Sequence, residues 1–243
     1  MLGVVLALAV QHCAFSGPAT HLIGSCGHMF DQDPKMMLAS RTNVIDGVWR
    51  RDADPSAVWA GTMSDADDPH APIELETYGG AGILRTVYGW FYASNIRTSA
   101  QGLTFDVDSA HEVLPNDLDR EIVRRSAAML SSTNVWNRKD NRKCAQGATS
   151  WSIYCAMEAA TAEVTGGMDH RRPAMEVVRE IVDDRTAGRG YNHRLMNYNN
   201  DPATTLADVA SLFREALERM NDAVWLQAHG FATSTDVFDI ART

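Results

Sequence analysis

The chain has 243 residues, of which 45% are hydrophobic and 22% charged, and its formal net charge is −9. This composition is that of a globular protein of one or two domains, and it excludes a collagen, a coiled coil and a wholly disordered chain. The negative charge argues against a protein that holds duplex DNA, because neutralising phosphates requires a concentrated positive field. The charge is uneven, since residues 1–116 carry 6 basic and 13 acidic side chains, whereas residues 117–243 carry 16 and 18.

The chain begins with an apolar run, Leu2 to Val10, that is about half as long as the roughly 20 residues a membrane-spanning helix needs. The first positively charged residue is Lys35, so the run lacks the basic start of a secretory signal. We interpret the run as a buried helix or strand. We therefore expect no membrane association and a cytoplasmic location, or a virion-associated one if the protein is encoded by a phage.

Four cysteines are too few for a disulfide scaffold in a chain of this length, so reduced thiols are the default expectation. They nevertheless fall into two pairs, one in each half: Cys13 with Cys26, and Cys144 with Cys155. A local bridge within each pair stays open as the alternative in an oxidising compartment.

Turn residues punctuate the first half of the chain. It breaks at Gly17-Pro18 and again from Gly24 to Gly27, and Asp33-Pro34 predicts the start of a short helix over 35–40. Later segments rich in β-branched and aromatic residues predict strands at 44–49, 57–63, 73–78, 83–93 and 103–107. The segment 83–93 is the densest in apolar residues, and we expect it to be the central strand.

Apolar residues recur at helical spacing in the second half. Helices are predicted over 118–131, from Trp151 to a stop at Gly166-Gly167, and onward from Pro173. Thr205 and Asp208 form the pattern of a capping box before a helix that runs to about residue 221.

The expected fold class is α+β, with a strand-containing N-terminal portion packed on a mainly α-helical C-terminal domain. We expect an acidic mixed portion over 1–116, a helical domain over 117–222, and a C-terminal arm over 223–243.

Five pieces of the second half follow one another in an order that resembles a known family. They are Arg120 to Leu130, Trp136, Cys144-Ala145-Gln146-Gly147, Tyr154 to Ala159, and Tyr198-Asn199-Asn200-Asp201-Pro202-Ala203-Thr204-Thr205. Residues from about 120 to 221 resemble the uncharacterised bacterial and phage domain family numbered 6197. The resemblance implies a helical fold and a bacterial or phage origin, but no activity.

The last of these motifs departs from the family pattern. Tyr198 replaces the family's tryptophan, Asn200 its aspartate, and Ala203-Thr204 its Gly-Arg pair. The candidate binding residues taken from the motifs are Trp136, Gln146, Tyr198, Asn199 and Asp201.

Potential metal ligands gather near the N-terminus. His12, Cys13, His21, Cys26 and His28 lie within 17 residues, and two cysteines with two or three histidines are the ligand types of a tetrahedral zinc site. The metal candidates are Cys13, His21, Cys26 and His28. Their irregular spacing favours buried cysteines and turn histidines instead, so we expect no cofactor and keep zinc as the alternative.

A cysteine nucleophile is a second hypothesis. Cys144 would attack, Gln146 would stabilise the oxyanion, and a histidine with an orienting group would serve as the base. The candidates for these last two roles are His170 or His193, with Asn199 or Asp201. Such residue types also occur together by chance in chains of this length.

A basic run lies beside two tryptophans, Trp136 and Trp151. It contains Arg138, Lys139, Arg142 and Lys143. These side chains could contact a nucleic-acid backbone while the tryptophans stack on bases. A solvated surface loop is the competing interpretation.

No catalytic motif is complete, so we expect a non-enzymatic binding or assembly protein. Its partner would be another protein or a second copy of the chain, met by the aromatic segment 88–92 and the apolar tail. The alternatives are a small cysteine- or metal-dependent enzyme and, less favoured, a nucleic-acid-associated factor that uses Arg138–Lys143.

Overall fold

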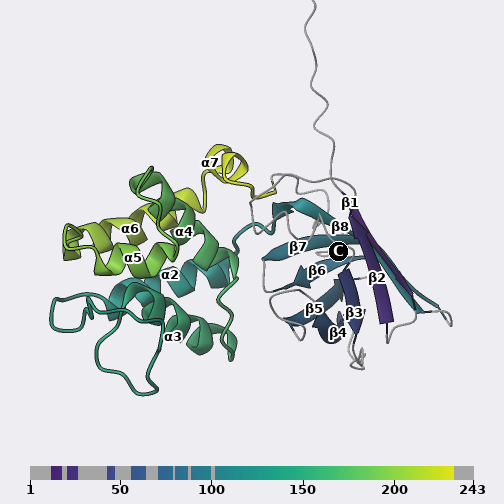
Figure 1. The fold of residues 1–243 in the computed structure, drawn as a ribbon, viewed down its shortest axis with the longest axis horizontal. Coiled ribbons are helices and arrows are strands. Elements are labelled where there is room, and N and C mark those ends of the chain that lie inside the picture. Colours follow the sequence, from purple (N-terminus) through teal and green to yellow (C-terminus); the bar gives the residue numbers. More distant parts are fainter. Residues whose placement is uncertain are drawn as a thin grey trace, which may run out of the picture. The chain divides into compact units, whose positions relative to one another are not determined.

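The structure is a computed structural model, and it describes residues 12–17, 21–26, 43–46, 56–63, 71–78, 80–86, 89–99 and 102–232 (Figure 1). Side chains are described over 73–77, 80–86, 89–97, 105–107 and 112–232. The apolar run Leu2 to Val10, the predicted helix over 35–40 and the tail 233–243 lie outside the described residues.

Antiparallel strands make up the described N-terminal part. They are β1 (His12–Gly17), β2 (His21–Cys26), β3 (Asn43–Asp46), β4 (Ser56–Met63), β5 (Ala71–Tyr78), β6 (Ala81–Arg85), β7 (Trp90–Ser99) and β8 (Gly102–Glu112). Each strand pairs with the next one along the chain, and β8 pairs back with β1. The sheet therefore closes into a barrel.

The sequence predicted a chain break at Gly24, but Gly24 lies within β2, opposite Phe15 of β1 and Asn43 of β3. Ladder hydrogen bonds to two neighbouring strands outweigh the weak local preference of glycine.

The predicted central strand over 83–93 is wrong as a single element. It divides into β6 and β7, which are joined by a turn in which the backbone N–H of Thr86 donates to the carbonyl of Gly89 at 2.9 Å. A Cβ atom at Gly89 would lie 2.8 Å from Oε1 of Glu112, so the Glu112 side chain would have to shift to accept a larger residue. The glycine inside the apolar run marks this turn.

The core of the strand part includes the aromatic segment. Leu75, Leu84 and Phe91 lie opposite one another on three neighbouring strands, and all three are fully buried. Trp90 and Tyr92 are only 4% and 6% exposed. These three aromatic residues therefore do not form the partner-binding surface that the sequence suggested, while Tyr88 lies outside the described residues.

Helices follow the strands, so the fold class is α+β, as predicted. They are α2 (Asp117–Met129), α3 (Ile153–Thr165), α4 (Pro173–Arg185), α5 (Arg194–Asn200), α6 (Leu206–Arg219) and α7 (Ala223–Ala228). The local signals are confirmed: α3 is capped by Gly166 with φ of +81°, α4 begins at Pro173, and Thr205 and Asp208 form a capping box at α6.

One hydrophobic core joins the helices. Helix α4 contributes the fully buried residues Val177, Val178 and Ile181, and α2 packs against α3, α4 and α6. Trp225 and Leu226 of α7 belong to the same core, although they lie in the predicted C-terminal arm. The chain divides between Val113 and Leu114 into two compact units. None of the described helices is long and apolar enough to cross a lipid bilayer.

Candidate functional site

A long connection between α2 and α3 carries most of the residues singled out in the sequence. Its two ends are held together at the tryptophans: the backbone N–H of Trp151 donates to the Val135 carbonyl at 2.6 Å, and that of Asn137 donates to the Trp151 carbonyl at 2.8 Å. Residues 137–150 project from this base, and we refer to them as the basic loop.

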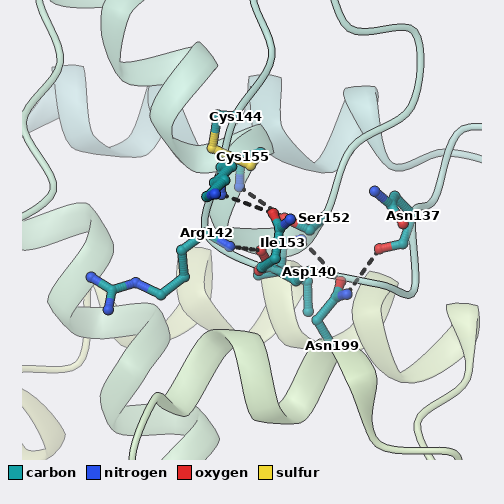
Figure 2. The surroundings of a disulfide bond; sticks show 10 residues. Asn137, Asp140, Arg142, Cys144, Ser152, Ile153, Cys155 and Asn199 are labelled. Atoms are coloured by element: carbon teal, nitrogen blue, oxygen red, sulfur yellow. Dashed lines mark hydrogen bonds between the residues drawn. A yellow bond between two sulfur atoms is a disulfide. The ribbon is translucent and has the colours of Figure 1, made fainter.

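Asn199 of α5 anchors the base of the basic loop (Figure 2). Its Oδ1 accepts from Trp136 Nε1 at 2.8 Å and from the backbone N–H of Ile153 at 3.0 Å. Its Nδ2 donates to the Asn137 carbonyl at 2.9 Å and to Asn200 Oδ1 at 3.0 Å. An amide side chain has two donor hydrogens and two acceptor lone pairs, so all four are engaged. Asn199 is fully buried and serves as a structural anchor.

A second anchor joins the loop to the end of α5. The backbone N–H of Asp140 donates to Asn200 Oδ1 at 2.7 Å, and Asn200 Nδ2 donates back to the Asp140 carbonyl at 2.8 Å. Asp140 Oδ1 accepts from the backbone N–H of Arg142 at 2.7 Å, which shapes the next turn. The first half of the loop is therefore rigid.

A disulfide holds the second half. Cys144 and Cys155 are bonded, with their Cα atoms 5.3 Å apart, so the expectation of reduced thiols is wrong for this pair and the alternative of a local bridge holds. A bonded sulfur has no thiolate, and the thiolate is the nucleophile in cysteine chemistry. Cys144 therefore does not act as a nucleophile in this state.

The other members of the proposed catalytic set either have different partners or are exposed. Asn199 has no free hydrogen-bonding group with which to orient a histidine. His193 is exposed before α5, where its Nδ1 lies 3.5 Å from Nη1 of Arg142, a cation rather than an orienting carboxylate. His170 is exposed before α4, and Gln146 is exposed within the loop.

Asp201 and Tyr198 also have structural partners. Asp201 Oδ2 accepts from Tyr191 Oη at 2.5 Å and from Arg189 Nη1 at 2.7 Å, and the hydrogen bond from Tyr191 is the main reason that the pKa of Asp201 is lowered. Tyr198 is buried, and its hydroxyl oxygen accepts from Arg185 Nη1 at 3.3 Å. These motif residues hold the region after α4 and α5 together.

The four cations of the basic loop remain at the surface. The guanidinium of Arg138 lies 4.9 Å from the ring centre of Trp136 and donates through Nη2 to the Asp201 carbonyl at 2.7 Å. The guanidinium of Arg142 lies 5.9 Å from the ring centre of Tyr154, and Figure 2 shows its side chain extending away from the disulfide. Lys139 and Lys143 are exposed. Among the described residues, no carboxylate forms an ion pair with any of the four.

Trp136, beside these cations, cannot stack on a nucleic-acid base as the sequence suggested. Trp136 is only 8% exposed, its indole N–H is used by Asn199, and Arg138 covers its ring. Trp151 is half-buried and packs against the helical core.

The sequence interpretation missed a group of buried charges on α3 and α4. The carboxylate of Glu176 is 1% exposed and accepts hydrogen bonds from Arg171 Nη1 at 3.2 Å, from Arg194 Nη2 at 3.4 Å and from Arg179. Glu158 is 3% exposed, and its Oε1 has no hydrogen-bond partner among the described residues. Burial, reinforced by Glu158, raises the pKa of the Tyr154 hydroxyl to about 12. Both carboxylates are buried. Sequence reasoning missed them because a charged residue in a helix is expected to face the solvent.

Burial also raises the pKa of Glu158, with Arg179 and a hydrogen bond from Tyr154 opposing the shift. The unfolded chain therefore loses this proton at a lower pH than the folded chain does. Glu158 contributes fully to stability below its unfolded pKa of about 4.3, and the contribution is lost as the pH rises through the folded pKa.

We expect Glu158→Gln to remove this decline, so that the free energy of unfolding of the variant falls less between about pH 4.3 and neutral pH than that of the wild type. Urea unfolding across this range measures the effect. Glu218→Gln, at an exposed position on α6, is the matched control and should follow the wild-type curve. Parallel pH profiles for wild type and Glu158→Gln would contradict the assignment.

The zinc candidates lie in the strand part. Cys13 and Cys26 are opposite one another on β1 and β2, and His21 begins β2, while His28 lies outside the described residues. Within the described residues, no group of three or more His, Cys, Asp or Glu side chains is placed to hold a metal ion.

Comparison with known proteins gives one match. No curated protein and no solved structure matches the chain. Residues 115–219 match the model of DUF6197, a family of unknown function, and these residues run from just before α2 to the end of α6. The helical part of the chain therefore contains a DUF6197 domain.

Proposed function

We propose that this protein is a non-enzymatic binding or assembly protein of a bacterium or phage, and that its helical domain docks an acidic partner protein through the basic loop. The contacting residues are Arg138, Lys139, Arg142 and Lys143. The proposal places the protein in the cytoplasm, or on the virion if a phage encodes it.

The observation that carries the proposal is the contrast between paired and unpaired cations. Most arginines elsewhere in the helical domain bind carboxylates of their own chain, as Arg172 does with Asp119 at 3.0 Å and Arg185 with Glu215 at 2.7 Å. Arg214 on α6 is an exception, since it forms no ion pair among the described residues, but it stands alone and not in a cluster. The four cations of the basic loop have no such partner among the described residues. Because Asn199, Asn200 and the disulfide hold this loop, docking would cost little conformational entropy.

An acidic protein surface suits the loop better than a nucleic acid does. Proteins that bind single strands combine cations with exposed aromatic faces on which bases stack, whereas Trp136 is buried and Trp151 is half-buried.

Charge reversal tests the proposal. We expect Lys139→Glu with Lys143→Glu to weaken binding to poly-L-glutamate, used as a carboxylate probe, by at least about tenfold at low salt, because both attractive charges become repulsive. Fluorescence anisotropy with labelled probe measures the affinity. The matched control is Arg124→Glu with Arg214→Glu, which makes the same change in net charge at exposed positions on α2 and α6.

Equal loss of affinity in both double variants would contradict a role for the loop. Tighter, salt-sensitive binding of a single-stranded RNA oligonucleotide than of poly-L-glutamate would overturn the choice of an acidic protein. Light scattering of the wild type and the loop variant tests whether a second copy of the chain is the partner. If the wild type self-associates and the loop variant does not, the partner is a second copy of the chain.

A further inference from the structure

The disulfide has an unusual position within the basic loop. Among the described contacts, residues 143–150 make hydrogen bonds only within the loop: the backbone N–H of Lys143 donates to Asn141 Oδ1 at 3.0 Å, and that of Ala148 donates to the Ala145 carbonyl at 3.2 Å. The bond from Cys144 to Cys155 is what ties this segment to a helix. Apart from its two chain ends, the segment is therefore tied to the rest of the domain by this one cross-link among the described contacts.

The rest of the loop does not depend on that bond. Its base is closed by the hydrogen bonds among Val135, Asn137 and Trp151, and Asp140 is held by Asn200. The cores of α2, α3 and α5 contain buried side chains that do not involve either sulfur. Opening the disulfide would free 143–150 and leave the helical domain folded.

The two sulfurs differ in exposure and in their electrostatic surroundings, as thiol exchange requires of an attacked sulfur and a leaving sulfur. Cys144 is half-buried between the exposed residues Lys143 and Ala145, whereas Cys155 is 8% exposed. Positive charge next to Cys144 attracts an incoming thiolate. Cys155 is the third residue of α3, where the positive end of the helix dipole stabilises a departing thiolate.

We propose that Cys144–Cys155 is a thiol–disulfide exchange site for a dithiol reductant. The reductant's thiolate attacks the sulfur of Cys144, the bond between the two cysteines breaks, and its electron pair leaves on the sulfur of Cys155, which takes up a proton. The second thiol of the reductant then displaces Cys144. The protein gains two electrons and two protons, and the reductant becomes a disulfide.

Exchange at this site controls docking, a consequence that rests on the proposed function of the basic loop. In the oxidised state Cys144 ties Lys143 to α3, within the same loop that carries Arg138, Lys139 and Arg142. In the reduced state Lys143 moves with the freed segment, so the four charges no longer act from one rigid surface. The oxidised protein is the form that docks, and reduction by a dithiol converts it to the form that does not.

The experiment treats the oxidised full chain with dithiothreitol in native buffer, alkylates free thiols, and maps the modified peptides, so that Cys144 and Cys155 are measured separately from Cys13 and Cys26. We expect reduction no more than about tenfold slower than in denaturant, because Cys144 is accessible in the folded state. Circular dichroism should show the helices intact, and hydrogen exchange should increase at 143–150. Oxidised glutathione added to the reduced protein should form its mixed disulfide at Cys144.

Three results separate the claims. Reduction only after the helices unfold, or an adduct at Cys155 instead of Cys144, would overturn the exchange site whatever the affinity for poly-L-glutamate. If exchange controls docking, reduction should lower the affinity for poly-L-glutamate threefold to tenfold, which corresponds to about one or two exposed charge pairs. Reduction that opens 143–150 without this loss would overturn the control of docking. Absence of poly-L-glutamate binding in both redox states would contradict the proposed function and leave the exchange site standing.

The double variant Cys144→Ser with Cys155→Ser provides the control. It should fold, bind the probe like the reduced wild type, and keep the same affinity when dithiothreitol is added. A double variant that fails to fold would show that the disulfide is required for the structure, and would overturn its role as a reversible site.

Discussion

Replacing Asn199 by alanine is expected to lower the free energy of unfolding by about 3 to 5 kcal/mol, which is a large part of the stability of an ordinary domain. The substitution leaves two buried groups without partners, the indole N–H of Trp136 and the backbone N–H of Ile153, and it also removes the partly buried hydrogen bond to the Asn137 carbonyl. Each such group retains the cost of leaving water without the compensating hydrogen bond. Urea unfolding followed by tryptophan fluorescence measures the loss.

Asn141→Ala is the matched control, because it makes the same substitution at an exposed position of the same loop. Its Oδ1 accepts only a local hydrogen bond from Lys143 among the described contacts, and water replaces that bond readily. We expect a change within about 0.5 kcal/mol for this variant. Similar losses for the two variants would show that Asn199 is not the anchor of the loop.

Glu176→Gln should have an effect of similar size by a different mechanism. Glu176 is the shared carboxylate for Arg171, Arg179 and Arg194, and it is fully buried on α4. Glutamine keeps the volume but removes the negative charge. The positive charges of the partly buried guanidinium groups are then no longer balanced by a carboxylate. Removing one partner of a buried ion pair costs about 3 to 5 kcal/mol. Thermal and urea unfolding at neutral pH check the prediction.

Two comparisons make this test specific. Glu121→Gln removes the carboxylate from the exposed pair with Arg125 on α2, and we expect little change in stability because water screens that pair. Adding Arg179→Met to Glu176→Gln should recover part of the lost stability, since it removes one of the uncompensated charges. A double variant less stable than the single one would contradict the electrostatic explanation.

Signals within a few residues of one another account for the elements that were predicted well. The capping box of Thr205 and Asp208, the proline at Pro173 and the stop at Gly166 act on backbone groups in the same turn. Short helix α5 carries no such cap, and β2 contains a glycine that pairs across two neighbouring strands. Patterns within a few residues do not show pairing between strands or packing between helices, so they did not predict these two elements.

The roles predicted for the motif residues also changed, because contacts between distant parts of the chain determine them. Trp136 and Asn199 were expected to bind a ligand, but they are 63 positions apart and bind one another. The two cysteine pairs were visible in the sequence, while the redox state was not. Glu158 and Glu176 were missed because the sequence does not show that arginines on other turns and helices surround a buried carboxylate.

The sequence by itself determined that basic residues gather at 138–143 in an otherwise acidic chain, and that capped helices follow a strand-rich half. Only the tertiary structure decided which cations are already paired. Ion pairs such as Arg172 with Asp119 join residues that are far apart in the chain, and the first half of the basic loop is held by α5 and not by its own sequence. The spare positive charge of the basic loop is therefore a property of the fold, because it is what remains after folding has paired most of the other arginines of the helical domain.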